Sequence, residues 1–152
     1  MIIEEKLKQL GIEIPDAPKP LAAYIPAVRT GNLVFTSGQL PFLNGELQYR
    51  GKVGGDVSVD DAKAAAKLCA INCLSAVKSV IGSLDEIARV VKITAFIASA
   101  DGFTNQPEVA NGASGFMLEV FGDAGRHSRG AVGVSELPRG ACVEIETVFE
   151  IK

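Results

Sequence analysis

Arg129 stands at a place in the chain where a guanidinium needs a partner. It directly precedes the small apolar run from Gly130 to Val134, which is typical of a strand. A charge at the mouth of such a strand calls for an anion, either a bound ligand or an acidic side chain. From these residues alone, a salt bridge to Glu144 or Glu146 is the better interpretation.

Glu144 and Glu146 lie two residues apart in the predicted last strand, so both point to the same face. A carboxylate there could pair with Arg129 or act on a bound water as a general base. A symmetric hairpin register across Pro138 would leave Arg129 on the order of 10 Å from Glu144, at about 3.4 Å per residue. Spacing alone does not bring the pair together, and a solvated acidic edge is the preferred interpretation for Glu146 and Glu150.

Other catalytic arrangements find little support. His127 is the single histidine of the chain, so a Ser or Cys triad has one candidate base, and a solvated polar histidine is the better interpretation. No two glycines are spaced G-x-G, and Gly51-Lys52 is followed by Val53, so a phosphate-binding loop is not expected. The segment from Thr36 to Gln39 could offer hydroxyls and backbone donors to a ligand, although a plain strand end explains it equally well.

The composition narrows the class of protein. The 152 residues, 47% of them hydrophobic, predict residues 1–21 as an N-terminal helix and arm and 22–152 as a single domain. A net charge of -3, with no cluster of Lys and Arg, disfavours nucleic acid as a partner. The acidic start, and the lack of an apolar run near the ~20 residues of a membrane span, predict a cytoplasmic protein without a membrane segment. The three cysteines are expected to be small buried thiols rather than disulfide partners or metal ligands.

These candidate residues must be positioned by strands and helices, whose order follows from hydrophobic periodicity and turn signals. Ser58 and Asp61 approximate a capping box that opens the clearest helix, and Gly82 ends it. The expected elements are a helix over 3–10, strands over 24–28 and 33–39, a possible strand within 46–55, a helix from 58 to about 81, a strand over 87–98, a helix from 107 to about 122, and strands over 130–135 and 142–151.

This order of elements predicts an α+β fold in which both long helices pack on one face of a sheet. The other face also needs cover, because residues of both parities are apolar in 95–98 and 130–134. Association with copies of the same chain would supply that cover.

Two segments together resemble the RidA/YjgF family. The C-terminal one runs from Arg129-Gly130-Ala131-Val132-Gly133-Val134-Ser135-Glu136-Leu137-Pro138 to Val143-Glu144-Ile145-Glu146, with the Leu-Pro and the Arg-to-Glu interval of the family. The N-terminal one is Gly31-Asn32-Leu33-Val34-Phe35-Thr36-Ser37-Gly38-Gln39-Leu40-Pro41, preceded by Tyr24. The resemblance covers residues 22–151.

The resemblance implies a chorismate-mutase-like α+β fold and a homotrimer with ligand sites in the clefts between subunits. It also implies a 2-iminobutanoate/2-iminopropanoate-deaminase-like hydrolase, which converts enamines and imines of the 2-aminoacrylate type to 2-oxo acids and ammonia without a cofactor. In the family, the residue matching Arg129 binds the substrate carboxylate and the one matching Glu144 handles the water. The positions that match pocket-lining residues are Tyr24, Ser37, Gly38 and Asn111.

The implied chemistry is physically reasonable. A two-pronged contact from Arg129 fixes the carboxylate and leaves the adjacent C=N carbon beside a water that Glu144 can orient or deprotonate. Because an imine is already electrophilic, modest positioning is sufficient, and neither metal nor histidine is required.

The chain also departs from the family pattern. Ala131 stands where many family deaminases carry Cys, and Gly130 stands where Ser or Ala is commoner. The N-terminal arm, residues 46–55 and residues 100–125 are longer than in compact members, which indicates a divergent subgroup with different pocket rims. Two alternatives to a deaminase stay open. One is a non-catalytic trimer that binds or senses small carboxylates such as 2-oxo acids. The other is an endoribonuclease, which the lack of paired histidines and of a basic groove disfavours.

Overall fold

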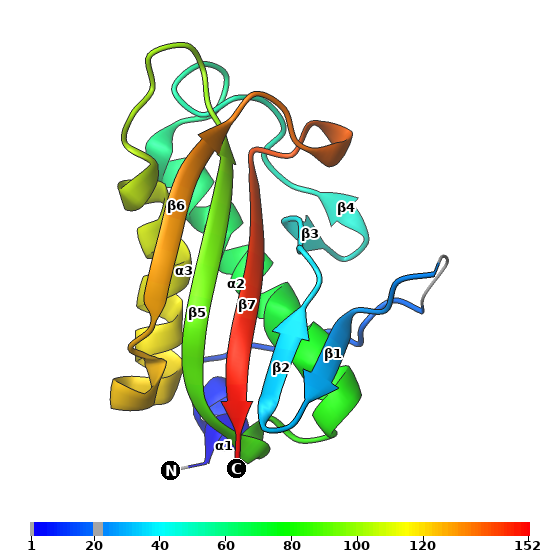
Figure 1. The fold of residues 1–152 in the computed structure, drawn as a ribbon. Helices are drawn as coiled ribbons and strands as arrows, with labels where there is room; N and C mark the ends of the chain where they lie inside the picture. The colour runs from blue at the N-terminus through cyan, green and yellow to red at the C-terminus, as the bar shows by residue number, and fades with distance from the viewer. Residues whose placement is uncertain (1, 20–22) are drawn as a thin grey trace.

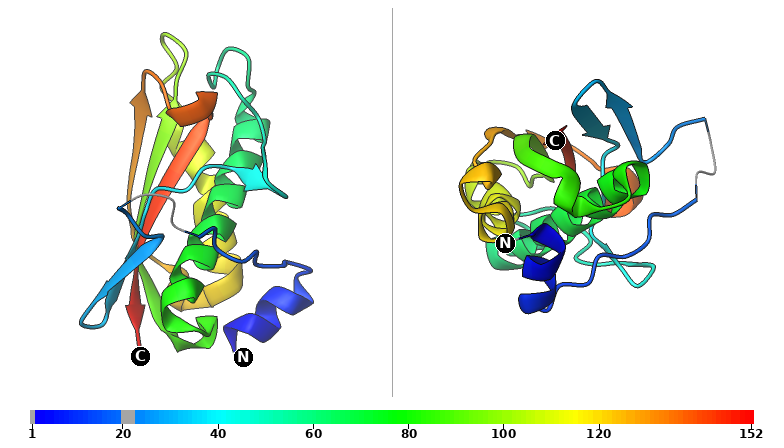
Figure 2. Two further views of the ribbon diagram at one scale, coloured as in Figure 1. Left: turned by 90° about the vertical axis from the view of Figure 1, so that its right-hand side faces the viewer. Right: turned by 90° about the horizontal axis from the view of Figure 1, so that it is seen from below.

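The structure, a computed structural model, describes residues 2–19 and 23–152. One mixed sheet carries two long helices, α2 (Val59–Ile81) and α3 (Gln106–Phe121), on one of its faces (Figures 1 and 2). The α+β architecture expected from the sequence, with both helices on one face, is confirmed. The expected boundary between residues 21 and 22 lies outside the described residues.

Five strands form the main sheet in the order β1-β2-β7-β5-β6 (Figure 1). Their bounds are β1 Ala27–Thr30, β2 Leu33–Thr36, β5 Ile87–Ala98, β6 Ser128–Val134 and β7 Val143–Ile151. β6 runs parallel to β5, whereas the other neighbouring strands are antiparallel. A separate hairpin of β3 (Phe42–Leu43) and β4 (Glu46–Leu47) turns at Asn44-Gly45, so the strand expected within 46–55 is reduced to the two residues of β4.

The hairpin register considered for the last two strands is not formed. β5 lies between β6 and β7 in the sheet, so the segment around Pro138 crosses the end of a neighbouring strand instead of making a tight turn. β5, α3 and β6 form a strand–helix–strand unit, and such a crossover is what allows two parallel strands to be neighbours.

The first hairpin is confirmed, although its strands are displaced from the expected ranges. β1 begins at Ala27 rather than Tyr24, because Pro26 has no N–H to donate to a ladder. The turn consists of Gly31 and Asn32, with Gly31 at a φ of 58°. β2 ends at Thr36, so the segment from Ser37 to Gln39 follows the strand rather than closing it.

α2 is the central helix of the core. The Ser58 hydroxyl accepts a hydrogen bond from the Asp61 N–H at 3.1 Å, and Gly82 ends the helix at a φ of 84°, as expected. By length and composition alone α2 could cross a membrane, but 50% of its most apolar stretch is buried inside the domain, as in a core helix. Its buried side chains are mostly small and belong to Ala62, Ala65, Ala66, Cys69, Ala70, Cys73, Leu74, Ser75, Ala76 and Val77.

Small residues allow α2 and α3 to cross closely. A Cβ atom on Gly112 of α3 would overlap the backbone carbonyl oxygen of Lys63 in α2. Glycine is therefore required at this contact for steric reasons. The crossing also brings the Lys63 side chain to Glu108 of α3, with 2.7 Å between Nζ and Oε1.

The N-terminal arm packs against the same core. α1 (Ile3–Gln9) buries Leu7, and its Glu4 carboxylate lies 2.8 Å from the Lys78 ammonium of α2. Beyond α1 the chain passes along α2, where the Ser75 hydroxyl donates to the Pro15 carbonyl at 2.5 Å. Three 3-10 turns complete the described structure, η1 Leu84–Glu86, η2 Gly122–Gly125 and η3 Pro138–Gly140.

Candidate functional site

The Arg129 guanidinium is held by neutral side chains of α3. Its Nη1 donates to Asn111 Oδ1 at 2.8 Å and to Ser114 Oγ at 3.2 Å. Within residues 2–19 and 23–152, Arg129 forms no ion pair, so the salt bridge to Glu144 or Glu146 that local sequence favours is not formed. Arg129 is exposed and could therefore accept an external anion.

Asn111 is itself held from the other side. Its Nδ2 donates to Glu108 Oε2 at 3.2 Å, and Glu108 pairs with Lys63. The hydrogen bond from Lys63 lowers the pKa of Glu108, and the same bond raises the pKa of Lys63. This arrangement keeps the Asn111 oxygen turned toward Arg129.

Ser114 connects Arg129 to the histidine of the chain. Ser114 Oγ lies 2.8 Å from His127 Nε2, and His127 Nδ1 lies 2.6 Å from the Gly125 carbonyl oxygen. The His127 ring is partly buried and hydrogen-bonded at both nitrogens, so it is not the solvated polar residue expected from the sequence. Both ends of the ring are therefore fixed.

Glu144 lines a separate cavity of about 410 Å³. Burial raises the pKa of its carboxyl, and the neighbouring Glu146 carboxylate raises the pKa further. A raised pKa makes the carboxylate a stronger base toward a bound water. The other residues that line this cavity are Pro18, Lys19, Tyr24, Pro26, Gly38, Gln39, Leu40, Phe42, Pro138 and Arg139.

Gly38 and Ser37 shape this cavity in different ways. A Cβ atom on Gly38 would lie 2.7 Å from Glu144 Oε2, so glycine lets the loop approach the carboxylate closely. The Ser37 hydroxyl donates to the Ile25 carbonyl at 2.7 Å. Ser37 thereby holds the segment that carries Tyr24 against the end of β2.

Arg129 and Glu144 lie on opposite faces of the sheet. Arg129 is level with Ile93 of β5, which is buried on the helix face, so the Arg129 side chain points toward α3. Glu144 is level with Phe96, whose parity along β5 is opposite to that of Ile93, so Glu144 points to the outer face. A single chain thus brings Arg129 to Asn111, and Glu144 to Tyr24 and Gly38, but does not bring Arg129 to Glu144.

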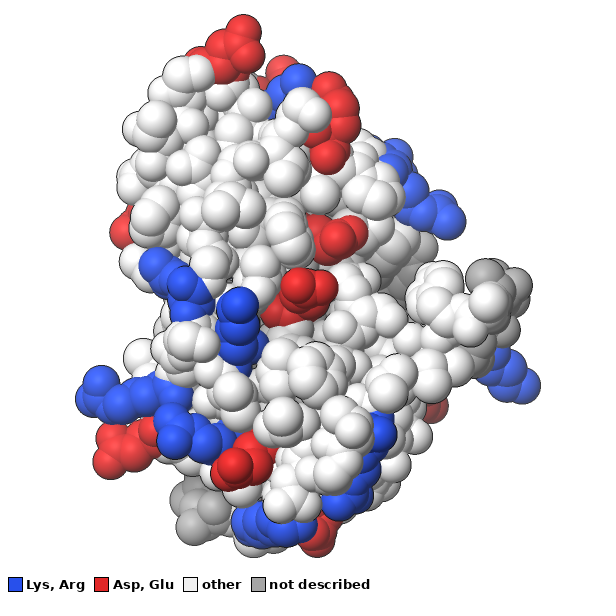
Figure 3. Space-filling view, in the orientation of Figure 1, with Lys and Arg blue, Asp and Glu red and all other residues white. Residues whose placement is uncertain are grey.

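Figure 3 shows the upper part of the outer face free of charged side chains, with acidic side chains near the middle and Lys and Arg side chains at the left and in the lower part. Val28, Phe35 and Val132 keep 51%, 43% and 47% of their surfaces exposed on it. The apolar second face expected from the sequence is thus confirmed. Exposed aromatic and branched side chains in one face are typical of a contact surface.

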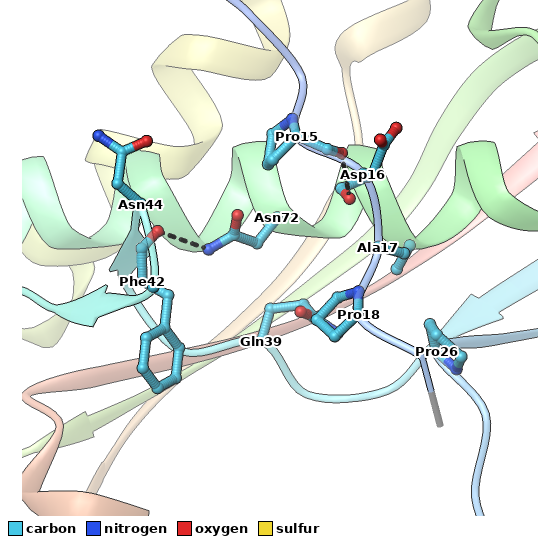
Figure 4. A pocket seen from close by; sticks show the side chains of 12 residues that line it. Pro15, Asp16, Ala17, Pro18, Pro26, Gln39, Phe42, Asn44 and Asn72 are labelled. Atoms are coloured by element: carbon cyan, nitrogen blue, oxygen red, sulfur yellow. Dashed lines mark hydrogen bonds between the residues drawn. The ribbon is translucent and has the colours of Figure 1, made fainter. Parts of the chain in front are cut away.

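A second cavity, of about 380 Å³, lies between the N-terminal arm, the β3–β4 hairpin and α2 (Figure 4). Asn72 of α2 supports its wall, because its Nδ2 donates to the carbonyls of Leu40 and Phe42 at 3.0 and 3.1 Å. The arm, through residues 15–18, therefore forms part of the pocket rim. Both cavities are lined by Pro18, Pro26, Gln39 and Phe42.

Two neighbours of Asn111 on α3, Glu108 and Ser114, are not among the site residues expected from the sequence. Glu108, Asn111 and Ser114 recur at three-residue intervals along α3, so helical spacing is the signal that could have grouped them.

All three cysteines are buried as expected, and burial raises the pKa of Cys73 to about 12 and that of Cys142 to about 11. Neither thiol is a nucleophile near neutral pH.

Comparison with known proteins identifies relatives along nearly the whole chain. Residues 4–145 match the family described as "YjgF/chorismate_mutase-like, putative endoribonuclease". Protein TCP17 of Trypanosoma cruzi is 41% identical over 150 residues, which cover 98% of this chain and 94% of the relative. The 2-iminobutanoate/2-iminopropanoate deaminase of Dermatophagoides farinae is 30% identical over 141 residues, which cover 93% and 95%.

Solved structures agree with this assignment. A protein of unknown function from Agrobacterium tumefaciens is 46% identical with a TM-score of 0.92, covering 99% of this chain and 92% of the other. Escherichia coli TdcF with bound serine is 26% identical with a TM-score of 0.61, covering 90% and 94%. These likenesses confirm the chorismate-mutase-like fold. With a family match over residues 4–145, the chain belongs to the RidA/YjgF family.

Proposed function

We propose that the protein is a cytoplasmic hydrolase that converts enamines and imines of the 2-aminoacrylate type to 2-oxo acids and ammonia. The observation that carries this proposal is the exposed Arg129 guanidinium, held at one nitrogen by two neutral side chains. Such a group is suited to bind a carboxylate. The relative named as a 2-iminobutanoate/2-iminopropanoate deaminase, and the one solved with serine, support a small carboxylate of the amino-acid type as ligand.

A homotrimer would complete the site. Arg129 lies on the edge strand β6, Glu144 lies on the opposite face of the sheet, and that face carries exposed apolar side chains. In the proposed assembly, Arg129 and Asn111 of one subunit meet the cavity of the next. That cavity contributes Tyr24, Gly38 and Glu144, and Ser37 holds the segment beside it through its hydrogen bond to the Ile25 carbonyl.

The proposed reaction begins with the substrate carboxylate on Arg129 and a water beside Glu144. Glu144 accepts a proton from the water as the water oxygen adds to the carbon of the protonated imine, which gives a neutral carbinolamine. Glu144 then returns this proton to the amine nitrogen; the C–N bond breaks, the hydroxyl proton passes to solvent, and ammonia leaves as the C=O of a 2-oxo acid forms. No cofactor takes part in these steps.

An amino-acid oxidase that generates a 2-imino acid in the assay tests turnover directly. The wild-type protein should accelerate release of the 2-oxo acid above the rate in buffer. Absence of acceleration, in a sample that still binds 2-oxobutanoate, would reject the deaminase and favour a carboxylate sensor.

Complementation tests the shared site. Arg129→Ala and Glu144→Ala chains should each be inactive, whereas trimers refolded from an equal mixture should regain about a quarter of the wild-type activity, since one site in four receives both intact residues. Light scattering provides the control by giving the mass of each assembly. A monomer, or trimers that mix without recovering activity, would contradict the composite site.

The pH dependence tests the role of Glu144. Because burial raises the pKa of this carboxyl above its ordinary value of 4.5, the carboxylate form should be lost as pH falls through a higher range. Turnover, corrected for the spontaneous reaction, should therefore fall on the acid side with an inflection above 4.5. Glu144→Gln should bind 2-oxobutanoate normally, lose about 100-fold in kcat and show no such inflection; an unchanged profile in this variant would remove Glu144 from the mechanism.

A further inference from the structure

We propose that Ser114 and His127 are positioning residues for Arg129, which fix its guanidinium so that the Nε and Nη2 edge receives the ligand carboxylate. This inference rests on the proposed role of Arg129 as a carboxylate anchor. It concerns two side chains that do not themselves need to touch the ligand.

Four residues, Gly125, His127, Ser114 and Arg129, are linked by successive hydrogen bonds, and the Gly125 carbonyl sets the direction of each bond. This carbonyl oxygen can only accept, so His127 Nδ1, 2.6 Å away, carries a proton. In the neutral ring Nε2 is then an acceptor, and the Ser114 hydroxyl at 2.8 Å donates to it. The Ser114 oxygen is left with its lone pairs turned toward Arg129 Nη1 at 3.2 Å.

The second hydrogen bond of the same nitrogen, to Asn111, has a direction that is fixed in the same way. Glu108, paired with Lys63, accepts from Asn111 Nδ2, so Asn111 presents its oxygen to Arg129 Nη1 at 2.8 Å. Asn111 and Ser114 thus engage both protons of Nη1. An arginine has five N–H donors, and within the described part of the chain no hydrogen bond occupies those on Nε and Nη2, which leaves them for a two-pronged contact with a carboxylate.

These hydrogen bonds should strengthen ligand binding, because Arg129 is exposed and its side chain would otherwise be free to move. A free arginine side chain loses rotamer entropy when it is ordered by a ligand, which weakens binding. Here the ordering is done beforehand by side chains from α3 and by His127. Loss of Ser114 or His127 should therefore weaken carboxylate binding without changing the step at the C=N carbon.

The test uses 2-oxobutanoate as the probe and follows the Arg129 Nε–H signal by ¹H–¹⁵N NMR. In the wild type, the probe should shift this signal strongly. Ser114→Ala and His127→Phe should each raise the Kd about 10-fold, raise KM for the imine similarly and leave kcat near the wild-type value. Ser114→Thr and His127→Gln, which keep a polar atom at each position, should retain most of the affinity.

Arg126→Ala is the matched control, because Arg126 is an exposed neighbour whose ion pair with Asp123, at 3.4 Å, lies outside this hydrogen-bonded chain. It should bind the probe as the wild type does. The inference is overturned if Ser114→Ala and His127→Phe keep the wild-type Kd, or if Arg126→Ala weakens binding equally. Failure of the proposed function looks different, because Arg129→Ala would then bind the probe normally or the wild type would bind it without turnover.

Discussion

Arg129→Ala should lose at least about 100-fold in kcat/KM and should no longer bind 2-oxobutanoate measurably. Each charged hydrogen bond to a carboxylate contributes about 1.5–3 kcal/mol, and two are removed together. At about 1.4 kcal/mol per tenfold change, even the lower end of that range gives the stated loss. Calorimetry with the 2-oxo acid and the coupled oxidase assay measure the two effects separately.

Two variants make the Arg129 result specific. Arg129→Lys keeps the charge but lacks the planar fork, so it should bind with intermediate affinity. Glu144→Ala should bind the probe as the wild type does and lose turnover. If Arg129→Ala retained both binding and turnover, carboxylate recognition would have to reside elsewhere, and the proposed site would be wrong.

Gly112→Ala is expected to be the most damaging single change to the fold. The added Cβ would overlap the Lys63 carbonyl oxygen, and neither backbone can yield without separating α2 from α3. Forced overpacking of this kind costs about 3 kcal/mol or more when it displaces backbone. Urea unfolding should show a midpoint well below that of the wild type, or the protein should fail to accumulate in soluble form.

Gly115→Ala is the matched control within the same helix. No heavy atom lies within 4 Å of the position that its Cβ would take. Alanine favours a helix over glycine by up to about 1 kcal/mol, so this variant should be slightly more stable than the wild type. Equal destabilisation by both substitutions would mean that the close crossing at Gly112 is not the cause.

The local elements could be predicted from sequence because their signals are local. Ser58, Asp61 and Gly82 mark the ends of α2, and β-branched residues mark β5, whose observed bounds, Ile87–Ala98, equal the expected ones. Pairing between strands could not be read from periodicity, which gives faces but not neighbours. The helix between β5 and β6 was the signal for parallel pairing, and it outweighs the short spacing of β6 and β7.

The candidate site could be predicted only in part, because some of its contacts depend on tertiary packing. The family resemblance proposes Arg129 and Asn111 together, and the structure places them 2.8 Å apart. Ser114 and His127 join them because α3 packs beside β6, a tertiary contact that no local pattern specifies. The position of Glu144 on the opposite face depends on the registers of β6 and β7 against β5, which periodicity within one strand does not give.

The separation of Arg129 and Glu144 by the thickness of a sheet has a consequence for dilution. If the site is shared between subunits of a trimer, a dissociated chain carries Arg129 and Glu144 on opposite faces, where they cannot act on the same substrate molecule. Rate per chain should then fall as the protein is diluted below the dissociation constant of the assembly, although every chain remains folded. The concentration of the protein in the cell would therefore determine the fraction of chains in the active trimer, as well as the total rate.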